Sequence, residues 1–239
     1  MRRKHSSIYQ SRFHVGITLL FVALPVVFFI LFSKLAHVTG AVLLSAAGIS
    51  IARLFIAYII AALLGWLAAI LLYRGKRALI ALPIFDVLQS FPTFAALPFA
   101  VLLWGVSNFT VIFFLIIAMI WPVFFSIISS LKLIKHDWAE AVAVMGLDGA
   151  PYLAKFLLPI SIPGLITGSI IGLGEGWEAL VATEIIVGIK SGLGGFFQGF
   201  ANNPTITAFG ILGLLLIIFS INKLIWLPLL ERSHRMMEE

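Results

Sequence analysis

The chain has 239 residues, of which 62% are hydrophobic and only 11% are charged, and its mean hydropathy is +1.13. Apolar blocks of this kind are typical of a membrane protein with several spans, and because each span needs roughly 20 residues, no room remains for a separate soluble catalytic domain. The absence of cysteine excludes disulfide frameworks, iron–sulfur clusters and thiolate zinc sites, while the net charge of +6 must be located before it is interpreted.

Six hydrophobic runs are long enough to cross a bilayer. They cover about 13–32, 49–73, 79–104, 109–131, 160–187 and 205–230. The first run is too long for the apolar region of a signal peptide, so we expect a retained helix. Prolines at 83, 92 and 98 predict that the third span is kinked or broken. We therefore predict an all-α membrane protein with about six transmembrane helices: a tail and first helix over 1–40, a transmembrane domain over 41–231, and a tail over 232–239.

Basic residues gather on one side of these spans. If the N-terminus is cytoplasmic, the outer segments hold only Lys34 and Lys190. The inner segments then hold Arg2, Arg3, Lys4, Arg12, Arg74, Lys76, Arg77, Lys132, Lys135, Lys155, Arg232 and Arg235. By the positive-inside rule, both termini are predicted to be cytoplasmic. The positive charge is then explained by topology, without a nucleic-acid partner.

A polar segment, 137–159, interrupts the apolar half of the chain on the predicted cytoplasmic side. Asp137 is predicted as the N-cap of a helix that runs to Met145, and Gly146 as its stop. Pro151 suits the first turn of a second helix. The segment is therefore expected to form a helical hairpin at the membrane surface.

The first helix of this hairpin carries small and apolar residues at helical spacing. They are Trp138, Ala141, Val142 and Met145. Such a face fits a groove on a partner protein. The alternative is that the hairpin simply covers the end of its own bundle.

The same hairpin resembles the EAA loop of permease subunits of ABC importers. The family pattern is E-A-A, three residues, G, nine residues, I, one residue and L-P. The matching positions here are Glu140, Ala141, Val142, Gly146, Phe156, Leu158 and Pro159, with valine and phenylalanine replacing one alanine and the isoleucine. In that family the loop carries a coupling helix that sits in a cleft of the cytoplasmic ATPase, so the resemblance implies that these residues couple to an ATPase.

Other stretches are similar to the branch of this family that imports nitrate, bicarbonate, taurine, alkanesulfonates and thiamine-precursor pyrimidines. The similar positions are Ser50-Ile51-Ala52-Arg53, Gly65, Pro83, Phe91-Pro92, Leu97-Pro98, Trp104-Gly105, Trp177, Val181, Glu184 and Gly192-Leu193-Gly194. The likeness covers about 49–230. Thr183 departs from the pattern, which usually has alanine there.

This resemblance implies a type I (MetI-like) importer permease in a bacterial or archaeal plasma membrane. It implies a second permease copy, giving a homodimer, a cytoplasmic ABC ATPase dimer and an extracytoplasmic solute-binding protein, with membrane lipid around the spans. The chain has no G-x-x-x-x-G-K-[ST] loop. We therefore expect no cofactor and no enzymatic activity on this chain, and ATP with Mg²⁺ on the partner ATPase.

Charged residues within the spans are candidates for a translocation path, because ionisable groups in a membrane normally face protein or water. The charged candidates are Arg53, Asp86, Glu175, Glu178 and Glu184, and Trp177, which lies between two of the glutamates, is included with them. The alternative is a structural ion pair of Arg53 with Glu178 or Glu184. Acidic groups in a translocation path would repel anions, so the possibility of a cationic or neutral substrate stays open.

Small residues in the fifth span predict a tight helix-packing surface. They are Gly164, Gly168, Gly172, Gly174 and Gly176. None of the five histidines shows a partner at metal-ligand spacing, so no metal site is predicted.

Two other classes of protein remain as alternatives. An ATP-independent secondary transporter or channel would need its own coupling-ion site or pore. An intramembrane enzyme would need a catalytic constellation, and the chain has neither a G-x-S-x-G nor an H-E-x-x-H motif.

Overall fold

The structure is a computed structural model that describes residues 20, 23–31, 34, 40–226 and 228–229. Every regular element in that part of the chain is helical, as predicted. The α-helices are α2 (Gly40–Leu72), α3 (Gly75–Gln89), α4 (Thr93–Trp104), α5 (Asn108–Lys132), α6 (His136–Val144), α7 (Gly149–Tyr152), α8 (Leu158–Val187), α9 (Leu193–Gly199) and α10 (Pro204–Ile221). Two π-helical stretches, Leu153–Leu157 and Asn222–Trp226, precede α8 and follow α10.

Among the described residues, four helical segments are long and apolar enough to cross a membrane. They are Gly40–Leu72, Asn108–Lys132, Gly149–Val187 and Pro204–Ile225. A fifth span is reached if α3 and α4, bent by 81° at the break before α4, count as one broken span. This bend confirms the predicted interruption of the third run at Pro92, which lies directly before α4. Half of the first predicted span, 13–32, lies outside the described residues, so the number six and the side of the termini stay predictions.

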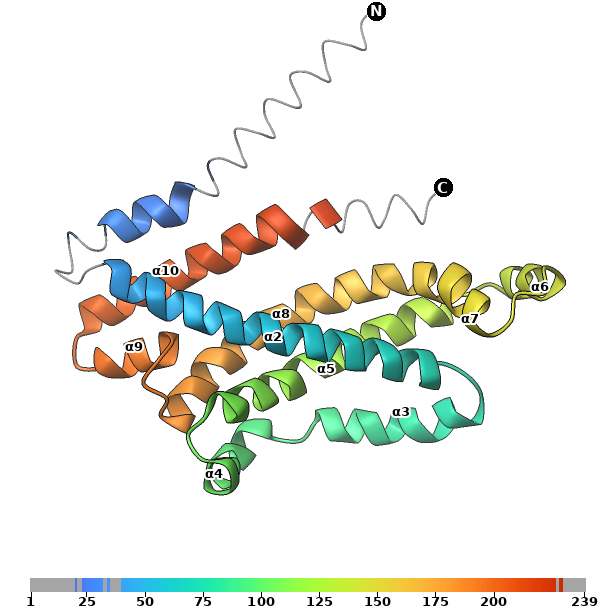
Figure 1. The fold of residues 1–239 in the computed structure, drawn as a ribbon, viewed down its shortest axis with the longest axis horizontal. Helices are drawn as coiled ribbons and strands as arrows, with labels where there is room; N and C mark the ends of the chain where they lie inside the picture. The colour runs from blue at the N-terminus through green and yellow to red at the C-terminus, as the bar shows by residue number, and fades with distance from the viewer. Residues whose placement is uncertain (1–19, 21–22, 32–33, 35–39, 227, 230–239) are drawn as a thin grey trace, which may run out of the picture.

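Helices α2, α5 and α8 lie alongside one another and form the centre of the bundle (Figure 1). Glycines at every fourth position of α8 face α5 and α2. They are Gly164, Gly168, Gly172 and Gly176. A Cβ added at Gly164 would lie 2.6 Å from the Ser126 carbonyl oxygen, and one at Gly168 would lie 2.7 Å from Val123 Cα. The two backbones therefore approach so closely that no side chain fits between them.

The predicted glycine surface is confirmed at these four positions, whereas Gly174 does not take part in the packing within this chain. An added Cβ at Gly174 would have no neighbour within 4 Å. Positions 172 and 176 are one helical turn apart, so residue 174 points to the opposite side of α8.

The two ends of the bundle differ in what they carry. The α6–α7 hairpin and the turn between α2 and α3 lie at one end, and α4 and α9 lie at the other (Figure 1). The basic turn at 74–77 and the polar hairpin, which the sequence analysis places on the same side of the membrane, are thus at the same end of the molecule.

We expect Gly168→Ala to lower the stability of the bundle by about 1–3 kcal/mol, because the new methyl group would overlap the backbone of α5. Gly174→Ala makes the same chemical change at the open position and should leave stability equal or slightly higher, since alanine favours the helix. Thermal unfolding midpoints of the two purified variants in mild detergent test this difference. Equal midpoints would contradict the packing argument.

Candidate functional site

The hairpin that precedes α8 has an ordered local structure. Helix α6 begins at His136, with Lys135 in the N-cap position and in an extended conformation (φ −70°, ψ 147°). The prediction that Asp137 is the N-cap is therefore wrong. Asp137 lies in the first turn, where its negative charge interacts favourably with the helix dipole and stabilises the helix. Gly146 has φ +64°, and its N–H donates to the Ala143 carbonyl at 3.0 Å. It ends the helix in the left-handed conformation, as predicted.

Six of the seven residues of the EAA-like pattern divide into two groups, and the seventh, Val142, is buried. Glu140, Ala141 and Gly146 are exposed on or just after α6. Phe156 is half-buried, with its ring 5.4 Å from that of Tyr152, and the remaining two residues open α8. The first group is therefore available to a partner, whereas the second attaches the hairpin to the bundle.

The predicted apolar face of α6 needs one correction. Trp138 and Met145 are 48% and 71% exposed, but Val142 is only 8% exposed and packs inward. Val144, which was not predicted, is 88% exposed. Trp138, Ala141, Val144 and the C-cap residue Met145 are therefore exposed apolar residues that follow one another at helical spacing.

A group of metal-ligand type residues at the start of α6 was not anticipated. The ligand atoms of His136, Asp137 and Glu140 lie within 4.8 Å of one another, and the His136–Glu140 contact is 3.2 Å. All three side chains are exposed. Exposed groups of this kind are common without an ion, so the arrangement does not by itself define a metal site.

Arg53 of α2 and Glu184 of α8 form a buried ion pair. Arg53 Nη1 lies 2.5 Å from Glu184 Oε1, and the two residues are 4% and 0% exposed. The Ser50 hydroxyl donates to the same carboxylate at 2.8 Å. The guanidinium also donates to Asn108 Oδ1 at 2.9 Å and to the carbonyl and hydroxyl of Ser191 at 3.0 and 2.6 Å. Both charges are thus satisfied by α2, α5 and the loop after α8, which makes their burial tolerable.

The loop after α8 closes over this pair through Gly192-Leu193-Gly194. Gly192 has φ +94°, and an added Cβ would lie 2.5 Å from Glu184 Oε1. The Leu193 N–H donates to Ser50 Oγ and the Gly194 N–H donates to Glu184 Oε2, both at 2.8 Å. The G-L-G triplet is therefore fixed by the charges that it covers.

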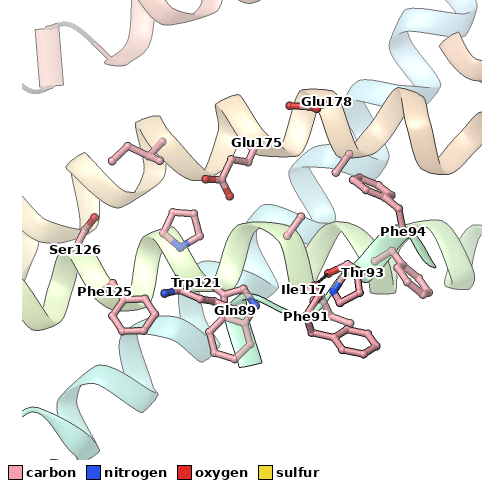
Figure 2. A pocket seen from close by; sticks show the side chains of 16 residues that line it. Gln89, Phe91, Thr93, Phe94, Ile117, Trp121, Phe125, Ser126, Glu175 and Glu178 are labelled. Carbon is pink, nitrogen blue, oxygen red and sulfur yellow. Dashed lines mark hydrogen bonds between the residues drawn. The ribbon is translucent and has the colours of Figure 1, made fainter. Parts of the chain in front are cut away.

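A cavity of about 730 Å³ lies beside the break between α3 and α4, against α5 and α8 (Figure 2). Aromatic rings form much of its wall: Phe91, Phe94, Phe114, Trp121 and Phe125. Glu175 and Glu178 of α8 also line it, and the Glu175 carboxylate points from α8 toward α5. No lysine, arginine or histidine is among the described lining residues. The cavity therefore combines aromatic faces with two carboxylates that no lining cation balances.

The sequence-predicted path residues do not all meet in this cavity. Trp177 is 6% exposed and lines a second hollow between α8 and α10, which Glu178 also borders. Asp86 is exposed and accepts a hydrogen bond of 2.7 Å from the Gln89 side chain. Gln89 lines the cavity, but Asp86 does not. Of the six candidates, Glu175 and Glu178 therefore line the cavity. Arg53 and Glu184 form the buried ion pair instead.

Sequence reasoning missed the polar partners of the ion pair. Ser50 stands three residues before Arg53 on one helix, and this one-turn spacing was a usable signal. Asn108 and Ser191 are far from Arg53 in the sequence, so their roles have no local signature. The aromatic wall was equally hidden, because aromatic residues are common in every span.

Removal of one charge from the ion pair should destabilise the bundle strongly. We expect Glu184→Gln or Arg53→Met to cost about 3–5 kcal/mol, because the remaining charge would be buried without a partner. The double variant Arg53→Met/Glu184→Gln should lose much less stability than the sum of the losses in the two single variants. Thermal midpoints in detergent provide the measurement, with Lys190→Met as a control that removes an exposed charge at the same end. Additive losses would contradict the pairing.

The chain is similar in sequence to several known membrane transport proteins. The chain is 33% identical over 175 residues to the nitrate import permease protein NrtB of Leptolyngbya laminosa, an alignment that covers 70% of this chain and 62% of NrtB. It is 29% identical over 149 residues to the bicarbonate transport system permease protein CmpB of Synechococcus elongatus, covering 62% of this chain and 53% of CmpB. With the taurine transport system permease protein TauC of Escherichia coli it shares 33% identity over 116 residues, or 48% and 42% of the two chains. The chain thus spans less than two thirds of the length of these relatives.

The profile of one protein family, described as binding-protein-dependent transport system inner membrane component, matches residues 61–233. The match includes the last third of α2, the hairpin and α8. Because it covers well over half of the chain, the chain belongs to the family of binding-protein-dependent transport system inner membrane components.

Proposed function

We propose that this chain is the membrane-spanning permease subunit of an ATP-binding cassette importer. The observation that carries the proposal is the exposed face of α6, held on a hairpin that continues into α8 without a break in helical structure. A partner that binds this face can act directly on a helix that lines the cavity. The chain itself supplies no nucleotide site, so ATP and Mg²⁺ would act on a separate ATPase.

The proposed assembly contains two permease copies, a cytoplasmic ATPase dimer and an extracytoplasmic solute-binding protein. Family membership supports the ATPase and the binding protein. The small, apolar surface of α6 supports docking into a groove, because Ala141 permits close approach and Trp138 and Met145 supply apolar area.

We further propose that the cavity is part of the solute path and that the solute is small, of the nitrate, sulfonate, taurine or thiamine-precursor type. Glu175 and Glu178 narrow this choice. Two carboxylates without a lining cation repel a simple anion, whereas a positively charged amine is attracted to them and to the surrounding aromatic faces. An amine-bearing solute such as taurine therefore fits the cavity better than nitrate or bicarbonate.

The coupling role predicts a difference between two alanine-to-arginine variants. Ala141→Arg should abolish ATP-driven uptake and retention of the ATPase, because a long charged side chain would stand on the docking face of α6. Ala154→Arg makes the same change on the exposed segment that leads to α8 and should retain both. Uptake in cells and co-purification from mild detergent are the measurements. Full uptake by Ala141→Arg, or solute movement without any ATPase, would favour the secondary-transporter alternative.

The solute path predicts a selective effect of the α8 carboxylates. Glu175→Gln with Glu178→Gln should reduce uptake of an amine-bearing solute by about tenfold or more, the equivalent of one lost charge interaction of roughly 1.4 kcal/mol. Asp86→Asn is the matched control, because this carboxylate does not line the cavity. Uptake of taurine, nitrate and bicarbonate is compared in the same cells. An unchanged taurine rate in the double variant would remove the carboxylates from the path.

A further inference from the structure

Another hollow, distinct from the cavity and from the hollow between α8 and α10, has a volume of about 570 Å³. It lies where α2 ends and the hairpin joins the bundle. Its apolar lining residues are Ile70, Leu71 and Leu157, and Leu71 is 54% exposed. Its basic lining residues are Arg74, Lys76 and Arg77. Since the span of α2 ends at Leu72, this hollow sits at the boundary between the hydrocarbon and the aqueous phase.

The polar side of the hollow is strongly cationic. No acidic residue lines it, and neither of the ion pairs found among the described residues involves Arg74, Lys76 or Arg77. Helix α3 also begins here. Its N-cap residue, Arg74, makes no side-chain hydrogen bond to the helix, and the first turn contains no acidic residue. The first N–H groups of α3 and three basic side chains therefore favour an anion at the same place.

Two tyrosines give the hollow a fixed wall. The hydroxyls of Tyr73 and Tyr152 lie 3.1 Å apart, and the Arg74 guanidinium lies 5.0 and 5.7 Å from the two ring centroids. Burial, together with the Tyr152 hydroxyl, raises the pKa of Tyr73, so that its phenol stays protonated and can donate a hydrogen bond. Tyr152 belongs to α7, and the wall therefore joins the end of α2 to the hairpin.

We propose that this hollow binds the phosphate headgroup of an anionic phospholipid from the leaflet on the hairpin side. The apolar side decides in favour of a lipid over a free phosphate ion, because Leu71 and its neighbours continue the hollow into the hydrocarbon, where acyl chains would lie. Basic hollows between helices at the membrane surface suit such headgroups. A bound lipid would touch both α2 and α7 and so stabilise the attachment of the hairpin.

The test uses the full-length protein in neutral detergent and measures its thermal midpoint. The probes are short-chain phosphatidylglycerol, phosphatidylcholine of the same chain length, and inorganic phosphate. We expect phosphatidylglycerol near saturation to raise the midpoint by roughly 5 °C, and the other two probes to have no effect. The readout does not involve transport, so its failure is distinct from a failure of the proposed function.

Two double variants separate a defined site from general surface charge. Lys76→Gln/Arg77→Gln should abolish the shift while keeping the midpoint measured without lipid. Lys132→Gln/Lys135→Gln removes two positive charges that do not line the hollow, and should keep the shift. Equal shifts in both variants would overturn the proposal in favour of diffuse electrostatics. A shift with inorganic phosphate alone would overturn the lipid as the source of the phosphate group.

Discussion

The close approach of α8 to α5 is the constraint on which the rest of the structure depends. Because membrane helices gain little from the hydrophobic effect between one another, backbone contact through small residues is a main source of their attraction. The glycine row of α8 allows that contact near the middle of the span. It fixes where the two ends of α8 lie, and hence where the hairpin emerges at one end and where Glu184 meets Arg53 at the other.

The same contact also creates the cavity. Glycine faces α5 on one side of α8, Glu175 lies next to that face, and Glu178 lies toward the side of Gly174, so neither carboxylate enters the contact. The bend between α3 and α4 borders this cavity, and Phe91 and Phe94, on either side of Pro92, contribute to its aromatic wall (Figure 2). One side of α8 and a broken span thus border the same hollow, which two carboxylates line.

Much of the fold follows from the sequence because bilayer thickness imposes the length of each apolar run. The run at 109–131 corresponds to α5 (Asn108–Lys132), and the proline break in the third run appears as the bend at Pro92. The start of the second span was predicted nine residues late, at 49 instead of Gly40, because small residues such as Ala46 and Gly48 weaken the apolar signal.

The candidate site was less predictable because its contacts join distant parts of the chain. The stop of α6 at Gly146 depends on one residue's backbone and was predicted. The choice of Glu184 over Glu178 as partner of Arg53 depends on the tilt and rotation of two helices, which no local pattern encodes. The inward turn of Val142 likewise depends on how the hairpin rests on the bundle.

The π-helical stretch Leu153–Leu157 has a mechanical consequence. It joins α7 to α8 with no loop between them, so residues 149–187 form one helical rod. A π-helical turn contains about one residue more than an α-helical turn. The residues before it, including α7, are therefore rotated about the helix axis by roughly 100° relative to their place in an uninterrupted α-helix. With a rise of about 1.5 Å per residue, Glu175 lies roughly 26 Å along this rod from Leu158. Because no loop interrupts this rod, the direction in which the hairpin leaves α8 is fixed relative to the direction of the Glu175 carboxylate.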